Sequence, residues 1–142
     1  LEENFFPIVL SGDHSSALGT LSGIKAAYPE QSIGVFWIDA HADLHSPYTS
    51  PSGNIHGMPL AAALANDNLS SRNTNDVSSE TKQHWENMKN IGCKGPKIAA
   101  ENLIYFGVRD TEEEEDRQIE KLQIKESNYF HSILSKTHKT SE

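Results

Sequence analysis

Residues 33–43, Ile-Gly-Val-Phe-Trp-Ile-Asp-Ala-His-Ala-Asp, join an apolar run to a cluster of polar side chains. The run 33–38 is apolar and rich in β-forming residues, so it predicts a buried strand that ends at Asp39. Side chains two residues apart in an extended chain point to the same side. We therefore expect Asp39, His41 and Asp43 to lie together at the carboxyl end of the strand, where open α/β sheets bind ligands.

The residue types in this cluster indicate a metal site. Two carboxylates and an imidazole packed so closely repel each other or lose solvation unless a cation lies among them. Because the set contains no thiolate, it suits Mn²⁺, Fe²⁺ or Zn²⁺ rather than a cysteine-based zinc site. The alternative is a polar strand end with chance spacing, and the pentapeptide 39–43 favours metal binding over it.

A second polar segment follows a second predicted strand. The apolar run 8–10 predicts a buried strand, and helical spacing of apolar residues predicts a helix over 15–28. Together with the strand at 33–38, these elements predict a βαβ unit with parallel strands. If the two strands are neighbours, His14 emerges beside Asp39. A histidine after a strand is more often structural than a ligand, and the parallel placement is what favours the ligand role.

A third segment, 50–59, has the sequence Ser-Pro-Ser-Gly-Asn-Ile-His-Gly-Met-Pro. Its glycines allow the backbone to approach a ligand closely. His56 is suited to proton transfer near neutral pH, and Ser52 and Asn54 offer groups that can hold a polar substrate. Taken alone, the segment favours an ordinary turn before the short helix that is predicted at 58–64.

The rest of the chain predicts one α/β domain over 1–125. The further predicted elements are a mobile surface loop at 66–79, a helix at 80–90, a strand at 103–106 and an acidic helix with a capping box of Thr111 and Glu114. Weak periodicity and high polarity predict a poorly ordered tail over 126–142.

Composition excludes several classes of function. The 142 residues carry a net charge of −8, so neither nucleic acid nor an anionic membrane is an expected partner. The one cysteine, Cys93, allows no intrachain disulfide and fits a reducing, cytoplasmic compartment. No apolar run approaches the roughly 18 residues that a membrane span needs.

Taken together, segments 11–15, 37–43 and 52–59 resemble the arginase superfamily, the ureohydrolases that include arginases, agmatinases and formimidoylglutamases. Phe106-Gly107-Val108-Arg109-Asp110 adds a weaker match, and order and spacing agree over most of residues 7–125. The resemblance implies a three-layer α/β/α sandwich around a mainly parallel sheet. Because family members are longer, we expect this domain to be incomplete.

The resemblance also implies a site with two Mn²⁺ ions bridged by a hydroxide, which attacks a guanidinium or amidine carbon. By the family pattern, His14, Asp39 and Asp43 ligate one ion. His41 ligates the other, and Asp39 is shared between the two. His56 would be the proton shuttle that helps the amine to leave.

Substrate contacts follow from the same resemblance. Arginases hold the substrate α-carboxylate with residues that correspond to Ser52 and Asn54. Acidic residues near the α-amino group correspond to Asp110 and, less directly, to Glu112 and Glu115.

Two positions depart from the arginase pattern. His45 stands where arginases usually carry an asparagine that touches the α-carboxylate, and Glu112 stands where they commonly carry aspartate. The stretch 49–54 nevertheless resembles the arginase form of the loop more than the agmatinase form.

The predicted function of the complete enzyme is hydrolysis of L-arginine to L-ornithine and urea, with agmatine or formimidoylglutamate as the alternative substrate. The complete enzyme is expected to be a homo-oligomer that acts on a small molecule, without nucleic-acid or membrane partners. The family's later Asp-x-Asp-x-x-Asp segment, which supplies two more carboxylates, does not occur after residue 125. We therefore expect the chain alone to be inactive. A non-catalytic relative or remnant that binds metal weakly or not at all is the alternative from a different class.

Overall fold

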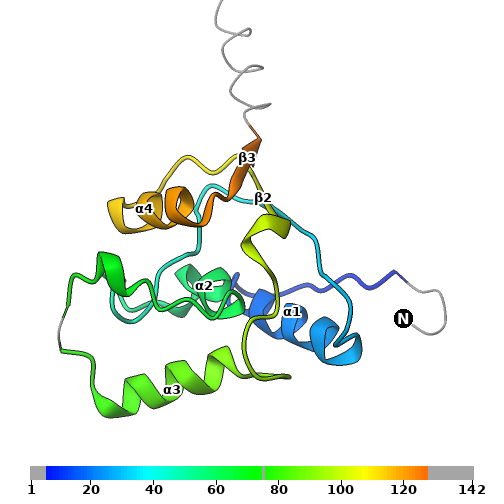
Figure 1. Cartoon of the computed structure of the whole chain (residues 1–142), viewed down its shortest axis with the longest axis horizontal. Helices are drawn as coiled ribbons and strands as arrows, with labels where there is room; N and C mark the ends of the chain where they lie inside the picture. Colours follow the sequence, from blue (N-terminus) through cyan, green and yellow to red (C-terminus); the bar gives the residue numbers. More distant parts are fainter. Residues whose placement is uncertain (1–5, 75, 128–142) are drawn as a thin grey trace, which may run out of the picture.

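The computed structural model describes residues 6–74 and 76–127, which form a parallel sheet with helices packed on one face (Figure 1). Three strands pair in chain order: β1 (Val35–Ile38), β2 (Leu103–Phe106) and β3 (Lys125–Ser127). Val35 lies opposite Leu103 and Ile104 lies opposite Lys125, and both ladders are parallel. The predicted α/β class with a parallel sheet is confirmed, and β2 has the predicted bounds.

Helices make the crossovers that parallel strands require. The helices are α1 (Ser16–Ala27), α2 (Pro59–Ala63), α3 (Ser79–Lys89) and α4 (Glu113–Leu122), with short 3₁₀ turns η1 (Ile55–Gly57), η2 (Leu69–Ser71) and η3 (Ala100–Asn102). Helix α4 alone joins β2 to β3, whereas α2 and α3 lie between β1 and β2 in the chain. None of the helices in the described part of the chain has the length and apolar character needed to cross a membrane.

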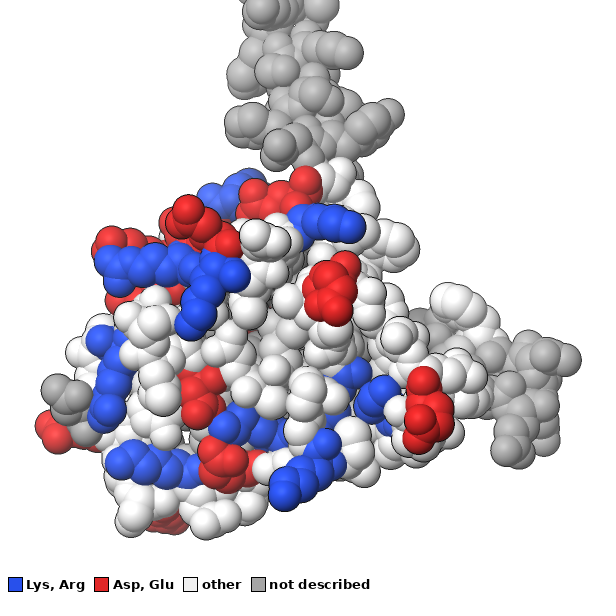
Figure 2. Space-filling view, in the orientation of Figure 1, with Lys and Arg blue, Asp and Glu red and all other residues white. Residues whose placement is uncertain are grey.

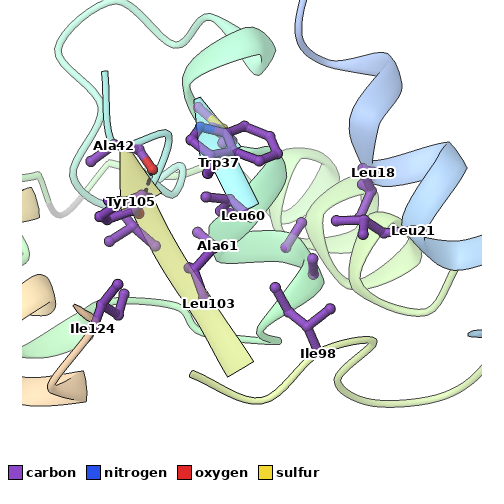
Figure 3. Packing of buried hydrophobic residues seen from close by; sticks show 14 of the residues in the cluster. Leu18, Leu21, Trp37, Ala42, Leu60, Ala61, Ile98, Leu103, Tyr105 and Ile124 are labelled. Atoms are coloured by element: carbon purple, nitrogen blue, oxygen red, sulfur yellow. Dashed lines mark hydrogen bonds between the residues drawn. The ribbon is translucent and has the colours of Figure 1, made fainter. Parts of the chain in front are cut away.

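The core lies between the sheet and the helices (Figure 3). Trp37 of β1 and Tyr105 of β2 point to this side, and all five residues of α2 are buried. Tyr105 donates its hydroxyl hydrogen to the carbonyl oxygen of Ala42 at 2.7 Å, so the core reaches directly to the loop after β1. Packing of α2 and Tyr105 therefore positions the segment that carries the predicted metal ligands.

The opposite face of β1 is open. Phe36 and Ile38 are 70% and 74% exposed, and Phe36 meets the ring of Phe106 edge-on. The prediction that the whole run 33–38 is buried is wrong for this face, because no helix among the described elements covers it. The described residues thus form two of the three predicted layers.

The predicted strand at 8–10 is also wrong. Ile8 and Leu10 are 79% and 93% exposed, and the segment pairs with no strand of the described sheet. Strand-forming residues become a strand only where a ladder partner is available. The helical crossovers of the described residues join β1 to β2 through α2 and α3, and β2 to β3 through α4, so neither is the predicted one at the start of the chain.

Three further boundaries differ from the predictions. Residues 66–79 are not purely a surface loop, because Asn68 is buried and donates to the carbonyl oxygen of Glu114. The capping box of α4 uses Glu112 and Glu115, one residue later than predicted. Residues 125–127 form β3, so the prediction of poor order is wrong for residues 126 and 127, and the rest of the predicted tail, residues 128–142, lies outside the described part.

Acidic and basic side chains are mixed on the face shown in Figure 2, including the region over α4. The acidic excess therefore does not make this face uniformly negative.

Candidate metal centre

The loops that follow β1 and β2 are joined at the carboxyl edge of the sheet. The backbone N–H of Asp39 donates to the carbonyl oxygen of Phe106 at 3.2 Å. Beyond it, the N–H groups of Arg109 and Asp110 donate to the carbonyl oxygen of Ala40 at 2.8 and 3.0 Å. The pentapeptide 39–43 and the segment after β2 are thereby held together.

His14 reaches the same edge from the turn before α1. Ser15 donates both its backbone N–H and its hydroxyl hydrogen to one carboxylate oxygen of Asp13, which forms the turn that begins the helix. The His14 ring stacks on the indole of Trp37, with the ring centroids 4.1 Å apart. The core tryptophan of β1 therefore orients His14, although residues 8–10 form no strand.

His14, Asp39 and Asp43 converge closely. The Nδ1 atom of His14 lies 2.7 Å from Asp39 Oδ2 and 3.0 Å from Asp43 Oδ2. One ring N–H can donate to only one of these oxygens, and the buried Oδ2 of Asp43 has no hydrogen-bond donor among the described residues. One possible ligand atom from each residue lies within 4.8 Å of the other two. A cation fits this arrangement, because it satisfies the carboxylate oxygen that the protein leaves without a donor.

The two carboxyl groups titrate differently. Burial and the charge of Asp39 raise the pKa of Asp43 to about 7. Burial also acts to raise the pKa of Asp39, but hydrogen bonds from the His41 N–H, the His14 ring and the Ala40 N–H outweigh it and lower that pKa. Such opposed shifts between neighbouring acids are typical of functional sites.

Asp43 joins the cluster through a turn, not through strand alternation. Strand β1 ends at Ile38, and Asp43 has a left-handed backbone with φ of 53°. The N–H groups of Leu60 and Ala61 at the start of α2 donate to the carbonyl oxygen of Asp43. The sequence argument correctly placed Asp43 beside Asp39. Its reason, the alternation of side chains along a strand, does not apply at Asp43, because the strand has already ended.

His41 lies at the edge of this cluster. Its side chain is 59% exposed, with Nδ1 3.5 Å from Asp39 Oδ1 and Nε2 3.5 Å from Asp110 Oδ2. It faces the Asp39 oxygen that does not contact His14. That oxygen, Asp39 Oδ1, also accepts the backbone N–H groups of Ala40 and His41.

A cavity of about 230 Å³ adjoins the cluster. It brings together the remaining side chains that the sequence singled out: His45, Ser52, Asn54, His56, Asp110, Glu112 and Glu115. These side chains come from the loop after β1, from the segment around η1 and from the start of α4. Parts of the chain that are distant in sequence therefore line the same cavity.

Two side chains that support this wall have structural roles that the sequence argument missed. Thr49 is fully buried, and its hydroxyl oxygen accepts the Ser46 N–H. Glu115 is 4% exposed and accepts the Leu44 N–H between Asp43 and His45. Burial raises the pKa of Glu115, although the Leu44 hydrogen bond acts to lower it. The position of Glu115 in a capping box was the sequence signal that could have indicated its role in α4.

Comparison with known proteins places this geometry in a family. The family model described as the arginase family matches residues 1–134. The arginase of Brevibacillus brevis is 42% identical over 120 residues, which cover 84% of this chain and 34% of that protein. The arginase of Bacillus subtilis (strain 168) is 41% identical over 125 residues, which cover 88% and 36%.

Solved structures agree with the sequence matches. A crystal structure of Bacillus subtilis arginase has a TM-score of 0.71 and 40% identity, with coverage of 93% of this chain and 39% of that one. The Helicobacter pylori arginase has a TM-score of 0.72 and 32% identity, with coverage of 96% and 46%. The chain belongs to the arginase family of hydrolases. It spans about a third of the length of the curated relatives that it matches.

The buried carboxylate of Asp43 gives a first prediction. Asp43→Asn removes the charge but keeps the shape, and asparagine tolerates the left-handed backbone. We expect a higher thermal midpoint for the metal-free chain, and Mn²⁺ binding that is weaker by about 10-fold or more. Thermal unfolding with and without Mn²⁺ measures both effects.

Asp110→Asn is the matched control, because the Asp110 side chain is 79% exposed. It should leave the metal-free midpoint unchanged. A lower midpoint for Asp43→Asn without metal would contradict the view that this carboxylate is destabilising until a cation binds.

Proposed function

We propose that this chain forms part of a manganese-dependent hydrolase that converts L-arginine and water to L-ornithine and urea. The observation that carries the proposal is the buried Asp43 carboxylate, which has no donor, lies beside His14 and Asp39, and lines the cavity. Oxygen-rich ligand sets with one imidazole suit Mn²⁺. Ions bound there supply a nucleophile from water at neutral pH and offset developing negative charge.

The ligand assignment in this proposal follows the family pattern, and the short distances around His14 support it. His14, Asp39 and Asp43 would hold one ion, and His41 with Asp39 would hold the other. Burial and the charge of Asp39 raise the pKa of Asp43, and a cation beside both acids would offset this by favouring their ionised forms.

His56 is the proposed acid and base. It lies in η1, lines the cavity and stands apart from the three-residue metal cluster. Its imidazole would deliver a proton to the nitrogen of the leaving amine as the C–N bond breaks. The flanking Gly57 lies close to the His45 ring, so the loop passes directly over the cavity wall.

The far end of the cavity supplies the proposed contacts with the amino-acid part of the substrate. Ser52 accepts the Asn54 N–H at 3.2 Å, which leaves its hydroxyl hydrogen available to a carboxylate. Asp110, Glu112 and Glu115 line the cavity and would favour the α-ammonium group. A homo-oligomeric complete enzyme in the cytoplasm, with a small molecule as its substrate, belongs to the same proposal.

The ligand count predicts how the chain behaves by itself. One ion would have three protein ligands, whereas the second would have His41 and the shared Asp39. We therefore expect about one tightly bound Mn²⁺ per chain and very little urea release, because the second ion is needed to activate the water. Equilibrium dialysis and a urea assay on the purified chain test this. Two bound ions with clear turnover would overturn it.

For a longer protein that carries these motifs, we expect faster urea release from L-arginine than from agmatine. Ser52 and Asn54 would hold a carboxylate that agmatine lacks. Initial rates with both compounds, at matched Mn²⁺, decide the substrate. Faster release from agmatine would assign the protein to the agmatinase branch.

In the same longer protein, His56→Ala should lower turnover by about 10²-fold or more, because the leaving amine loses its proton donor. Bound manganese should be unchanged, since His56 stands outside the metal cluster. His84→Ala, at an exposed position of α3, is the control and should keep full activity. Retained turnover in the His56 variant, or lost metal, would refute the assigned role.

A further inference from the structure

His45 is held between two acidic side chains at the wall of the cavity. Its side chain is 9% exposed, and Nε2 lies 2.8 Å from Glu112 Oε2 and 3.6 Å from Glu115 Oε2. On the other side of the ring, Nδ1 lies 3.1 Å from the Thr49 hydroxyl oxygen. The two positions at which this chain departs from the arginase pattern, 45 and 112, are therefore in direct contact.

The hydrogen bonds around the ring define where its hydrogen lies. A carboxylate only accepts hydrogen bonds, so the 2.8 Å contact requires a hydrogen on Nε2. The Thr49 hydroxyl oxygen already accepts the Ser46 N–H, so its own hydrogen is free to point at Nδ1. A hydrogen on His45 Nε2 that points at Glu112 is consistent with both contacts of the ring.

The carboxylates of Glu112 and Glu115 differ in how many of their hydrogen-bond acceptor sites are already occupied. Glu115 is buried, and its two carboxylate oxygens accept hydrogen bonds from the N–H groups of Leu44 and Glu112. Glu112 accepts a backbone N–H as the cap of α4, but its side chain is 50% exposed. A carboxylate has about four lone-pair sites, so Glu112 keeps acceptor capacity toward the cavity.

We propose that His45 is a positioning residue for substrate recognition, holding the Glu112 carboxylate against the cavity wall so that it receives the ammonium group at the far end of a guanidino substrate. The inference rests on the proposed function, since it assigns a chemical class to the far end of that cavity. Because the Nε2 hydrogen is committed to Glu112, His45 does not bind a substrate carboxylate. Within this wall Glu112 reads the ammonium group, while Ser52 and Asn54 remain the proposed contacts of a carboxylate.

Three guanidino compounds separate this role from a purely structural one. L-arginine carries both an ammonium and a carboxylate at the far end, agmatine carries only the ammonium, and 4-guanidinobutyrate carries only the carboxylate. Calorimetric titration of the chain in excess MnCl₂ measures the affinity for each. We expect His45→Ala and Glu112→Gln each to lower the affinity for L-arginine and for agmatine by about 10-fold, which is the effect of losing one charge-assisted hydrogen bond. In both variants the affinity for 4-guanidinobutyrate should stay within about twofold of the wild-type value, because a twofold difference is smaller than the loss of a hydrogen bond would cause.

A double variant tests whether the residues act together. His45→Ala combined with Glu112→Gln should weaken binding no further than either change alone, because both break the same contact. His45→Gln should recover part of the affinity, since its amide N–H can still donate to Glu112. Equal losses for all three ligands, or additive effects of the two changes, would overturn the positioning role.

A measurement without ligand decides whether the pair exists. Long-range ¹H–¹⁵N spectra of the metal-free chain should show the His45 hydrogen on Nε2, and Glu112→Gln should alter that signal. A hydrogen on Nδ1, or a signal indifferent to Glu112→Gln, would refute the pair. If the wild-type chain binds none of the three compounds while the pair is present, the recognition role fails; urea release by the longer protein tests the proposed function separately.

Discussion

The parallel pairing of β1 with β2 is the constraint on which the rest of the site depends. Parallel neighbours end at the same edge of a sheet, so the loops that follow them meet there. The Ala40 carbonyl oxygen accepts the N–H groups of Arg109 and Asp110, which joins the two loops by backbone groups alone. The loop that carries the proposed metal ligands and the acidic segment before α4 are therefore adjacent whatever their side chains are. The side chains then decide the chemistry of that edge.

The site concentrates acidic groups at a cost to stability. Asp39, Asp43 and Glu115 lie close enough for their charges to interact, and burial raises the pKa of both Asp43 and Glu115. Proteins keep such local conflicts where function requires them. Glu115 limits the conflict by accepting two backbone N–H groups, whereas Asp43 is left with an oxygen that lacks a donor. Glu115 is therefore an acid whose hydrogen bonds stabilise the fold, whereas Asp43 is an acid that is suited to bind a cation.

Helix α4 serves the fold and the cavity through the same two residues. Glu112 and Glu115 form its capping box, and the same carboxylates contact the His45 ring. Folding of the helix start therefore sets the far wall of the cavity. A change at either glutamate would act both on helix stability and on the proposed recognition of an ammonium group. Affinities for several ligands separate these two effects, whereas the affinity for one compound does not.

The sequence by itself determined the α/β class, the bounds of β2, most of the helices and the residue types of the metal cluster. These follow from periodicity, capping residues and motif spacing, which are local properties of the chain. Only the tertiary structure decided that Phe36 and Ile38 are exposed, that residues 8–10 form no strand, and that His45 meets Glu112. Burial and pairing depend on what packs opposite a residue, and that partner lies far away in the sequence. The contact between positions 45 and 112 exists only because two strands end side by side, and no local pattern records it.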